Sequence, residues 1–473
     1  MRFTKIICTL GPATSTKEDV RKLVSAGMNI ARINLSHGTL EQHLKTIKLL
    51  KEINGELKRK EGTRCIGILL DTKGAEIRTG DVKEKVAVEK GEEVVFSPKP
   101  LPKEKRTVVI VNHERFDKDV AEAECILIDN GLIRFDILEA RPDGSVLARS
   151  QEDGAIGSRR HVNLPGANLS MPSVTHKDWE DIAFAAKEDV DFLALSFIRE
   201  AKEIHEVRGF LEAHGARIGL ISKIETRQAI KNIKEIVEAS DGIMVARGDL
   251  GVEVPFESVP AIQDDIVEEA RLAGKPVIVA THMLESMIDQ PMPTRAEVTD
   301  IAHAATTRTD ATMLSGETAS GEFPYASVEA MDRVLQATEE HILLPAPMLE
   351  ATSHTEREAR AHAAVTLAVT TRATALFVMT KSGKTAVDLA RFRPNIPIIA
   401  FTDSEATQRK LQLSYGVNPV FIPFSTDPER TVKAAMDEAK HLGMLEKGNH
   451  VVLVSDTKAG DSSINTIQMR SIS

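Results

Sequence analysis

Short apolar runs alternate with longer amphipathic stretches along most of the chain. The apolar runs, which predict strands, are Thr4–Thr9, Asn29–Leu35, Ile66–Asp71, Phe192–Ser196, Ile218–Lys223, Gly242–Ala246, Val277–Ala280 and Ala311–Leu314. Between most of them, apolar residues recur every three or four positions, which predicts helices such as Lys17–Ala26, Leu40–Lys60, Ala201–Ala213 and Ile262–Ala273. Alternating strands and helices imply right-handed crossovers and a parallel sheet. Eight such units predict the α/β class and a closed (β/α)8 TIM barrel.

One interval interrupts this alternation, between the third and fourth predicted strands. The stretch Lys83–Ala148 has short alternating runs separated by turn sequences such as Lys90-Gly91 and Asp129-Asn130-Gly131. We therefore expect a small β-barrel domain over 73–170, inserted at the C-terminal face of the main barrel. Because active sites of such barrels lie at that face, the insert is placed to act as a lid.

Beyond the eighth strand, the pattern predicts a third domain. Helices are expected at Tyr325–His341 and Glu356–Thr371, separated by the proline-marked break Leu344-Pro345-Ala346-Pro347. Strands then alternate with helices again, at Leu376–Met379, Ile396–Thr402, Val420–Ile422 and His450–Ser455. This predicts an open α/β domain over 342–473, with the barrel formed by 1–72 and 171–341.

Composition narrows the class of protein. The 473 residues carry a formal net charge of -10, which argues against a nucleic-acid partner. No apolar run approaches the ~20 residues of a membrane helix, and Ile6–Leu10 is too short for a signal-peptide core. The three cysteines are scattered, without disulfide or metal-ligand spacing, which favours a reducing, cytoplasmic location.

Polar side chains gather where the predicted barrel strands end. Arg32, Asn34 and Ser36 share one face of their strand, because side chains alternate along a strand. Lys223 and Glu225 share a face of another, and Asp249 follows the next strand. Carboxylate oxygens in this number suit Mg²⁺ or Mn²⁺, and the surrounding cations suit a small phosphate substrate. The alternative to a metal and phosphate site is that Lys223 and Glu225 form only a structural ion pair.

The chain also carries segments that resemble the pyruvate kinase family. They stand in the family's order and spacing, at Lys5–Ala13 (KIICTLGPA), Ala31–Gly38 (ARINLSHG), Asp71–Gly80 (DTKGAEIRTG), Asn163–Gly166 (NLPG), Ile221–Glu225 (ISKIE), Met244–Pro255 (MVARGDLGVEVP), Pro293–Glu297 (PTRAE) and Met313–Ala319 (MLSGETA). The resemblance implies a phosphotransferase that moves a phosphoryl group from phosphoenolpyruvate to ADP, giving pyruvate and ATP, the last step of glycolysis. It also implies an allosterically regulated cytoplasmic homotetramer, in the short form that lacks an extra C-terminal phosphohistidine-type domain.

The resemblance assigns roles to individual residues. Lys223, Thr281 and Arg32 would be catalytic, and these three with Gly248 and Asp249 would bind the substrate. The resemblance implies that Mg²⁺ is held by Glu225 and Asp249, and K⁺ by Asn34, Ser36, Asp71 and Thr72. The implied nucleotide ligands are Pro12, Asn34, His37, Arg78 and Arg160. An effector's phosphate would be bound by Thr380, Lys381, Ser382, Gly383, Lys384 and Thr385. Glu at position 76 goes with a K⁺ requirement in this family. The effector is expected to be a sugar phosphate or AMP.

The chain departs from the family pattern at several positions around the expected lid. Ala75, Asn130, Arg160 and His282 stand where the family usually has Pro, Asp, Lys and Gln, so the kinetics of lid closure are open. Two other functions remain as alternatives. One is another metal-dependent enolate enzyme, such as an aldolase or lyase, and the other is a catalytically dead homologue that senses a metabolite.

Overall fold

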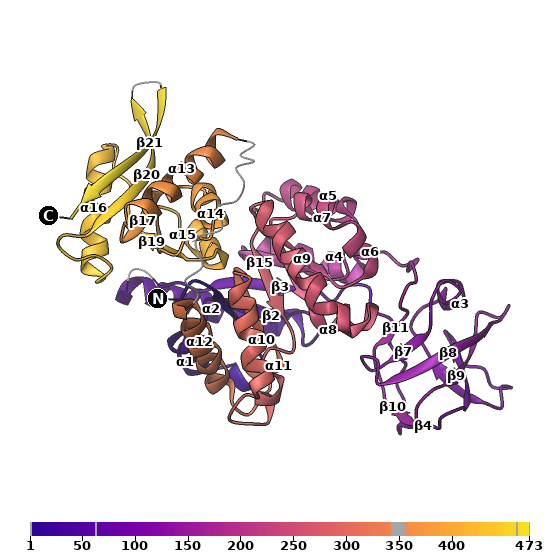
Figure 1. Cartoon of the computed structure of the whole chain (residues 1–473). Coiled ribbons are helices and arrows are strands. Elements are labelled where there is room, and N and C mark those ends of the chain that lie inside the picture. The colour runs from indigo at the N-terminus through magenta and orange to yellow at the C-terminus, as the bar shows by residue number, and fades with distance from the viewer. Residues whose placement is uncertain (1, 62–63, 342–354, 460–461, 473) are drawn as a thin grey trace.

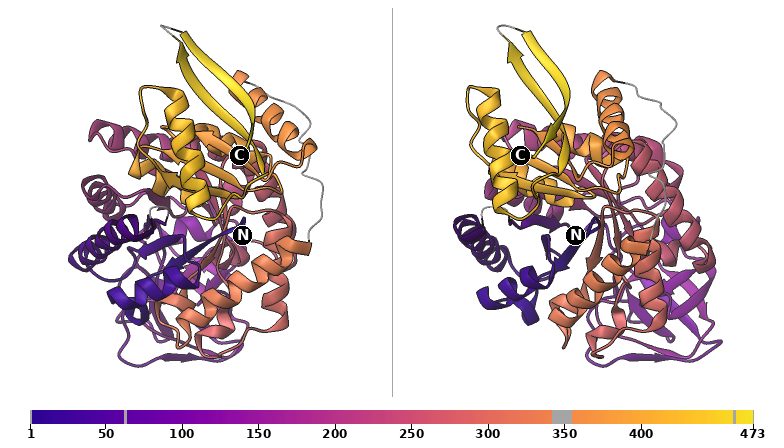
Figure 2. Two further views of the ribbon diagram at one scale, coloured as in Figure 1. Left: turned by 90° about the vertical axis from the view of Figure 1, so that its left-hand side faces the viewer. Right: turned by 60° about the vertical axis from the view of Figure 1, so that its left-hand side comes forward.

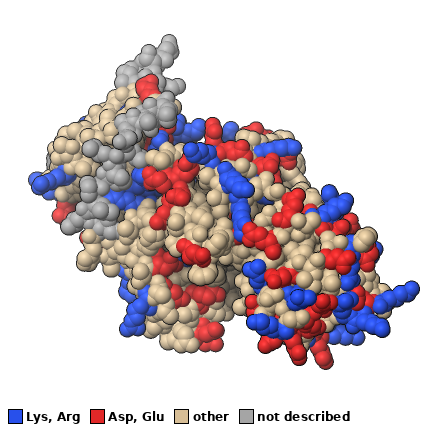
Figure 3. Space-filling view, turned by 45° about the vertical axis from the view of Figure 1, so that its right-hand side comes forward, with Lys and Arg blue, Asp and Glu red and all other residues tan. Residues whose placement is uncertain are grey.

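Three domains follow one another in space. The structure, a computed structural model, describes residues 2–61, 64–341, 355–459 and 462–472. A central barrel separates an inserted β domain at one end from a C-terminal α/β domain at the other (Figure 1). On the face drawn in Figure 3, Lys and Arg are interspersed with Asp and Glu, and the surface is hollowed between the inserted domain and the barrel. No helix in the described ranges is long and apolar enough to cross a membrane.

The barrel predicted from the apolar runs is confirmed. Within the described ranges, its strands are β1 (Lys5–Thr9), β2 (Ile30–Asn34), β3 (Gly67–Asp71), β12 (Phe192–Leu195), β13 (Gly219–Ile224), β14 (Gly242–Ala246), β15 (Val277–Ala280) and β16 (Ala311–Leu314). They are parallel and close in the order β1-β16-β15-β14-β13-β12-β3-β2. Each expected strand is present, and no bound differs from the expected one by more than one residue.

Helices cover the outside of this barrel. They are α1 (Lys17–Ala26), α2 (Leu40–Glu61), α4 (His176–Glu188), α5 (Ala201–Ala213), α6 (Arg227–Lys231), α7 (Ile233–Ala239), α8 (Arg247–Glu253), α9 (Val259–Leu272), α10 (Arg295–Thr306), α11 (Gly316–Ala319) and α12 (Pro324–His341), with short 3-10 turns η1 (Pro12–Thr14), η2 (Phe256–Ser258) and η3 (Glu285–Ile288). Local sequence sets where several begin. Thr16, Thr175 and Thr294 each accept a hydrogen bond from a backbone N–H in the first turn, and each forms a capping box.

The strands are apolar on both faces because both faces are buried. Their outward side chains pack against the helices in one large core. The inward side chains fill the barrel interior, and Leu413 of the C-terminal domain joins this inner cluster. Lys5 of β1 donates a hydrogen bond of 2.6 Å to the carbonyl oxygen of Val417 in the same C-terminal domain. The C-terminal domain therefore closes the N-terminal end of the barrel, opposite the strand ends that carry polar residues.

The inserted domain is built of short strands, as predicted. The segment 77–80 links the two edges of their main sheet into a small closed barrel, through antiparallel bridges of Arg78 with His161 and of Thr79 with Val111. A six-stranded sheet has the order β11-β7-β8-β9-β5-β6, and β10 pairs with β4 in a separate ribbon. Its elements are β4 (Val86–Val88), β5 (Glu93–Ser97), β6 (Thr107–Ile110), α3 (Phe116–Val120), β7 (Ile126–Ile128), β8 (Ile133–Ala140), β9 (Val146–Ser150), β10 (Gly154–Ile156) and β11 (Val162–Asn163). The sheet curls around a core that contains Phe96, Phe116 and Phe135.

The C-terminal domain is an open sheet with helices, as predicted. Its elements are α13 (Glu356–Thr370), β17 (Ala375–Met379), α14 (Lys384–Arg391), β18 (Ile398–Thr402), α15 (Glu405–Lys410), η4 (Leu411–Leu413), β19 (Val417–Phe421), α16 (Pro428–His441), β20 (His450–Ala459) and β21 (Ser462–Ser471). The sheet order is β19-β18-β17-β20-β21. The expected proline break at Leu344-Pro345-Ala346-Pro347 lies outside the described residues.

The end of the chain differs from the prediction. The last strand, β21, was not predicted, and it pairs with β20 in an antiparallel hairpin. These two antiparallel strands project beyond the rest of the domain (Figure 2). The strand pattern was missed because Ser462–Ser471 is mostly polar, as an edge strand can be.

Candidate active site

The barrel interior changes from apolar to polar towards the C-terminal ends of its strands. Ile30, Leu69 and Ile221 belong to the apolar inner cluster. Since inward side chains recur every second residue, the next inward position on each of these strands is Arg32, Asp71 and Lys223. The same two-residue period places Thr9 after Ile7 on β1, and Ser196 after Ala194 at the end of β12. A ring of polar side chains therefore lies directly above the packed interior.

These five polar residues contact one another around the barrel. Arg32 donates to Asp71 Oδ2 through Nε at 2.7 Å and to Thr9 Oγ1 through Nη1 at 2.9 Å. Lys223 Nζ donates to Ser196 Oγ at 2.7 Å and lies 3.4 Å from Asp71 Oδ1. Ser196 Oγ also donates to Asp71 Oδ1, at 3.4 Å. The contacts run through neighbouring strands, so two buried cations share one buried carboxylate.

The charges in this ring hold one another in their ionised forms. Burial acts to lower the pKa of Lys223, but the neighbouring carboxylates, first Asp71 and then Glu225, outweigh it and raise that pKa. Burial acts to raise the pKa of Asp71, but Lys223 and Arg32 together bring it below its usual value. The site therefore keeps a permanent positive charge at Lys223 at the barrel mouth.

Glu225 and Asp249 place two carboxylates beside Lys223. Glu225 accepts a hydrogen bond of 2.6 Å from the backbone N–H of Phe197 through Oε2. Its Oε1 lies 2.8 Å from Lys223 Nζ as an ion pair. Burial is the main cause that raises the pKa of Glu225, to about 7, and burial also raises the pKa of Asp249. Both carboxylates therefore favour a further positive charge.

These two carboxylates fit a divalent ion that completes its shell elsewhere. Within the described ranges, no cluster of three or more His, Cys, Asp or Glu side chains is arranged to enclose a metal. Mg²⁺ commonly keeps several waters and takes only one or two carboxylates together with substrate phosphate oxygens. Glu225 Oε1, which now pairs with the Lys223 ammonium, is the kind of acceptor that such an ion uses.

The end of β15 is held in an unusual conformation next to these carboxylates. Thr281 and His282 have φ values of 70° and 54°, a region that costs energy for residues other than glycine. Thr281 Oγ1 donates to the carbonyl oxygen of Ala280 at 2.6 Å and accepts from the N–H of Gly248 at 2.7 Å. The Gly248 N–H expected to receive a substrate carboxylate is thus already engaged, at the first turn of α8.

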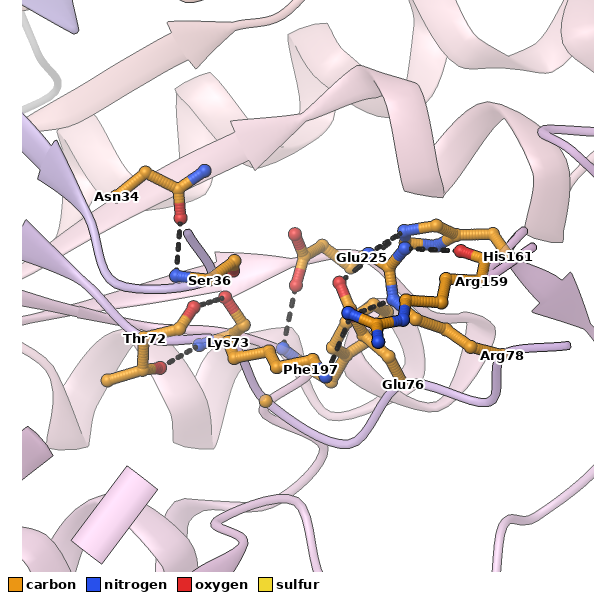
Figure 4. A network of polar contacts seen from close by, with 12 residues as sticks. Asn34, Ser36, Thr72, Lys73, Glu76, Arg78, Arg159, His161, Phe197 and Glu225 are labelled. Atoms are coloured by element: carbon orange, nitrogen blue, oxygen red, sulfur yellow. Dashed lines mark hydrogen bonds and ion pairs between the residues drawn. The ribbon is translucent and has the colours of Figure 1, made fainter. Parts of the chain in front are cut away.

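The inserted domain contributes a second cluster at the site, shown in Figure 4. Arg78 donates to Glu76 Oε2 through Nε at 2.7 Å, and its Nη2 lies 2.5 Å from His161 Nε2. Its Nη1 donates to the carbonyl oxygen of Arg159 at 2.8 Å. Lys73 Nζ lies 3.8 Å from Glu76 Oε2. Arg78 and Glu76 are close enough to influence the pKa of Asp249, so this cluster and the carboxylates share one electrostatic environment.

The connection that leads into the inserted domain is tightly packed. Gly74 has φ 73°, and a Cβ there would lie 2.7 Å from Ser196 Cβ and 2.8 Å from Phe197 Cδ2. Only glycine fits this close approach. Ala75, which stands where the resembled family usually has Pro, is buried against the same region. The inserted domain is therefore joined to the barrel directly beside Ser196 and Glu225.

The other expected site residues lie around the same mouth. Asn34 Oδ1 accepts from the N–H of Ser36 at 3.1 Å, and the carbonyl oxygen of Thr72 accepts from Ser196 Oγ at 2.7 Å. These groups follow the neighbouring strands β2 and β3 (Figure 4). Pro12 and His37 are exposed after β1 and β2. Arg160 lies in the inserted domain, where its Nη1 donates to Asp129 at 3.3 Å.

The expected effector loop joins β17 to α14, as predicted. Gly383, at φ 83°, precedes the helix, and its N–H donates to Thr380 Oγ1 at 2.9 Å. Thr380 and Thr385 are buried, whereas the side chains of Lys381, Ser382 and Lys384 are exposed. Of the six residues, these three exposed ones are available to a ligand.

Sequence reasoning missed three groups that the structure places in the site. Ser196 bridges Lys223 and Asp71, and the backbone N–H of Phe197 supports Glu225. A serine directly after the apolar run Phe192–Leu195 was the available signal, because it falls on the inward face. His161, in contact with Arg78, was also missed.

Comparison with known proteins agrees with this architecture. A family model described as "Pyruvate kinase, barrel domain" matches residues 1–328, and one described as "Pyruvate kinase, alpha/beta domain" matches residues 358–469. Plastidial pyruvate kinase 3 of Arabidopsis thaliana is 41% identical over 477 residues, covering 100% of this chain and 82% of the relative. Pyruvate kinase of Staphylococcus epidermidis is 39% identical over 98% of this chain and 79% of the relative. Pyruvate kinase of Geobacillus stearothermophilus is 38% identical over 100% of this chain and 81% of the relative.

Proposed function

Because this chain belongs to the pyruvate kinase family, we propose that the polar ring and carboxylates at the barrel mouth carry out the family's reaction. That reaction transfers a phosphoryl group from phosphoenolpyruvate to ADP, giving pyruvate and ATP. The observation that carries the assignment to this site is the Lys223 ammonium, which lies 2.8 Å from Glu225 Oε1 and 3.4 Å from Asp71 Oδ1 at the barrel mouth. Phosphoryl transfer needs positioning and charge neutralisation more than covalent chemistry.

Glu225 and Asp249 are the proposed holders of Mg²⁺ or Mn²⁺. The donor set fits, since both carboxylates are shifted towards their protonated forms by burial and would regain charge beside a cation. The ion would supply charge neutralisation for the substrate's carboxylate and phosphoryl oxygens. The N–H of Phe197 fixes the orientation of the Glu225 carboxylate towards the mouth.

Lys223 and Arg32 are the proposed phosphoryl-binding cations. Both are preorganised, because Ser196 and Asp71 fix the Lys223 ammonium, and Thr9 and Asp71 fix the Arg32 guanidinium. Fixed charges in a buried site stabilise a transition state without reorganising when the reaction occurs. Lys223 would therefore stabilise the moving phosphoryl group and the enolate of pyruvate.

Thr281 and Gly248 are proposed to act together. The substrate carboxylate would take the Gly248 N–H that Thr281 Oγ1 now accepts. The same exchange would leave the Thr281 hydroxyl with one contact fewer, free to join the relay that protonates the enolate. The strained φ at Thr281 and His282 supports a functional role for this turn.

The nucleotide is proposed to lie between the barrel mouth and the inserted domain. Pro12, Asn34 and His37 stand on the barrel rim, and Arg78 and Arg160 stand on the inserted domain. The hollow between the two domains in Figure 3 gives this arrangement room for a ligand. Two arginines on one side supply the donors that phosphates prefer.

Oxygens of Asn34, Ser36, Asp71 and Thr72 are the proposed K⁺ ligands, and Glu76 makes the ion necessary. We expect that leaving out K⁺ lowers the initial rate by more than about tenfold, since the site loses one preorganised positive charge. Glu76→Lys should restore a K⁺-independent rate by supplying that charge. Initial rates measured in K⁺ and in tetramethylammonium check both. A wild-type rate within about threefold without K⁺ would overturn the requirement.

The loop Thr380–Thr385 is the proposed site for the phosphate of an allosteric effector, a sugar phosphate or AMP. Its exposed Lys381, Ser382 and Lys384 stand at the start of α14, where backbone N–H groups favour anions. Ser382→Asp should abolish activation by such effectors, because a fixed negative charge repels the phosphate. The activation ratio over a panel of sugar phosphates and AMP checks this, and activation equal to wild type would remove the loop from consideration.

A homotetramer in the cytoplasm is the proposed state of the protein. The tetramer is carried over from the pyruvate kinase family to which the chain belongs. Cys8, Cys65 and Cys125 are unpaired, which supports a reducing compartment. Light scattering would measure the number of subunits in the assembly. Cell fractionation would show the compartment that contains the protein.

Pyruvate formation with single components left out tests the proposed function. Rates should be lost without ADP and lost without a divalent ion. Pyruvate released without ADP would favour a different enolate enzyme on the same barrel. Folded protein without turnover under any of these conditions would favour a catalytically inactive sensor.

A further inference from the structure

The imidazole of His161 lies against Arg78, a proposed nucleotide ligand. Its Nε2 is 2.5 Å from Arg78 Nη2. The backbones of the two residues are paired in an antiparallel bridge, so the contact is built into the inserted domain. Glu76 Oε1 lies 3.5 Å from the same imidazole nitrogen. Figure 4 shows the three side chains directed towards one another.

The contact determines which form of His161 is present. A guanidinium has only N–H donors, so Arg78 needs an acceptor. Nε2 can accept only when it carries no proton, which places the imidazole proton on Nδ1 and makes the ring neutral. A protonated ring would direct an N–H and a positive charge at Arg78. It would instead attract Glu76, which now accepts from Arg78 Nε at 2.7 Å.

We propose that neutral His161 is a positioning residue, which holds the Arg78 guanidinium in the orientation that receives the nucleotide's phosphate. Protonation of His161 breaks this contact and draws Glu76 away from Arg78, so the protein binds ADP more weakly at acidic pH. This inference rests on the proposed role of Arg78 in nucleotide binding.

The surroundings of His161 favour the neutral form near neutral pH. Burial is the largest cause that lowers its pKa, Glu76 acts to raise it, and Arg78 lowers it further. The more distant carboxylates of Asp129 and Glu225 act to raise it. His161 also lines a cavity of about 420 Å³ between the inserted domain and the barrel. A cavity of this volume is large enough to hold water, through which protons can reach the ring.

His161→Phe tests the contact, because phenylalanine keeps a ring but removes the acceptor. We expect the KM for ADP at pH 7.5 to rise about tenfold, the size that the loss of one hydrogen bond to a charged group predicts. The KM for phosphoenolpyruvate should stay within about twofold, since Arg32 and Lys223 bind that substrate. A general loss of structure would change both constants and kcat.

His161→Gln tests the titration, because its amide oxygen can accept from Arg78 at every pH. It should bring the KM for ADP back towards the wild-type value at pH 7.5. The wild-type KM should rise more steeply than that of His161→Gln between pH 7 and pH 5.5. Titration of the ADP phosphates near pH 6 is common to both proteins, so the difference belongs to His161. The exposed His205 on α5 offers a control, and His205→Gln should keep the wild-type pH response.

Arg78→Gln, assayed beside these variants, separates failure of the inference from failure of the proposed function. An Arg78→Gln variant with a wild-type KM for ADP would overturn the nucleotide role of Arg78, and the inference with it. A raised KM in Arg78→Gln together with an unchanged KM in His161→Phe would overturn the inference alone. Equal pH profiles for wild type and His161→Gln would overturn the pH response.

Discussion

Replacing Lys223 with Met lowers kcat by about 10³-fold, at the upper end of what removing one preorganised donor costs. The Lys223 ammonium is the one group that contacts Ser196, Asp71 and Glu225 together, in the described part of the barrel mouth. Steady-state rates of pyruvate formation at saturating phosphoenolpyruvate and ADP measure the loss.

Loss of Lys223 also leaves two buried carboxylates without their common cation. Breaking a buried ion pair in this way costs about 3–5 kcal/mol, so stability has to be separated from catalysis. Lys223→Arg keeps the charge and should melt close to wild type, yet remain far slower, because the guanidinium cannot occupy the ammonium's position. The exposed Lys202 serves as a matched control, and Lys202→Met should keep wild-type kcat. A Lys223→Met protein with more than a tenth of wild-type kcat would remove Lys223 from the chemistry.

Replacing Glu225 with Gln raises the Mg²⁺ concentration for half-maximal activity by about 100-fold, as expected when one of two carboxylate ligands is lost. Gln keeps the shape of the side chain and its acceptor for the Phe197 N–H, so the effect reports on charge. Mg²⁺ titrations of the initial rate give the constant, and Mn²⁺ binding followed by electron paramagnetic resonance confirms it without turnover. Glu257→Gln, at an exposed carboxylate of η2, is the control and should change the constant by less than about twofold. Unchanged Mn²⁺ binding in Glu225→Gln would contradict the assignment.

In the metal-free protein, Glu225 should make the free energy of unfolding depend on pH. Burial raises the pKa of Glu225 from its ordinary 4.5 to about 7, so the folded state holds this proton more firmly than the unfolded state. The free energy of unfolding that this group contributes is therefore present below pH 4.5 and is lost as the pH rises through 7. In EDTA, Glu225→Gln should remove the decline in the free energy of unfolding that this group causes as the pH rises. Urea unfolding at several pH values measures that decline.

The barrel and the polar ring were predictable because both depend on local patterns. Runs such as Val277–Ala280 are apolar throughout, since both faces of a barrel strand are buried. The inward positions after them carry Arg32, Asp71 and Lys223, which the two-residue period alone places together. Ser196 obeys the same period, but a single serine is a weak signal.

Features that depend on distant contacts were not predictable. Leu413 fills the base of the barrel from another domain, and no local pattern marks it. The Gly248 N–H is engaged because Thr281 adopts a positive φ, which its sequence does not require. The inserted domain has the expected strands, but the segment 77–80, which links its edges β11 and β6 through isolated bridges, was not predicted as a strand.

The fate of the phosphoryl group tests the central claim most directly. Phosphorus NMR can follow phosphoenolpyruvate, ADP, ATP and inorganic phosphate together in the presence of Mg²⁺ and K⁺. We predict that each phosphoenolpyruvate lost yields one ATP and one pyruvate, and that Lys223→Met slows both products equally. Pyruvate accompanied by inorganic phosphate in place of ATP would contradict transfer between two substrates at this site.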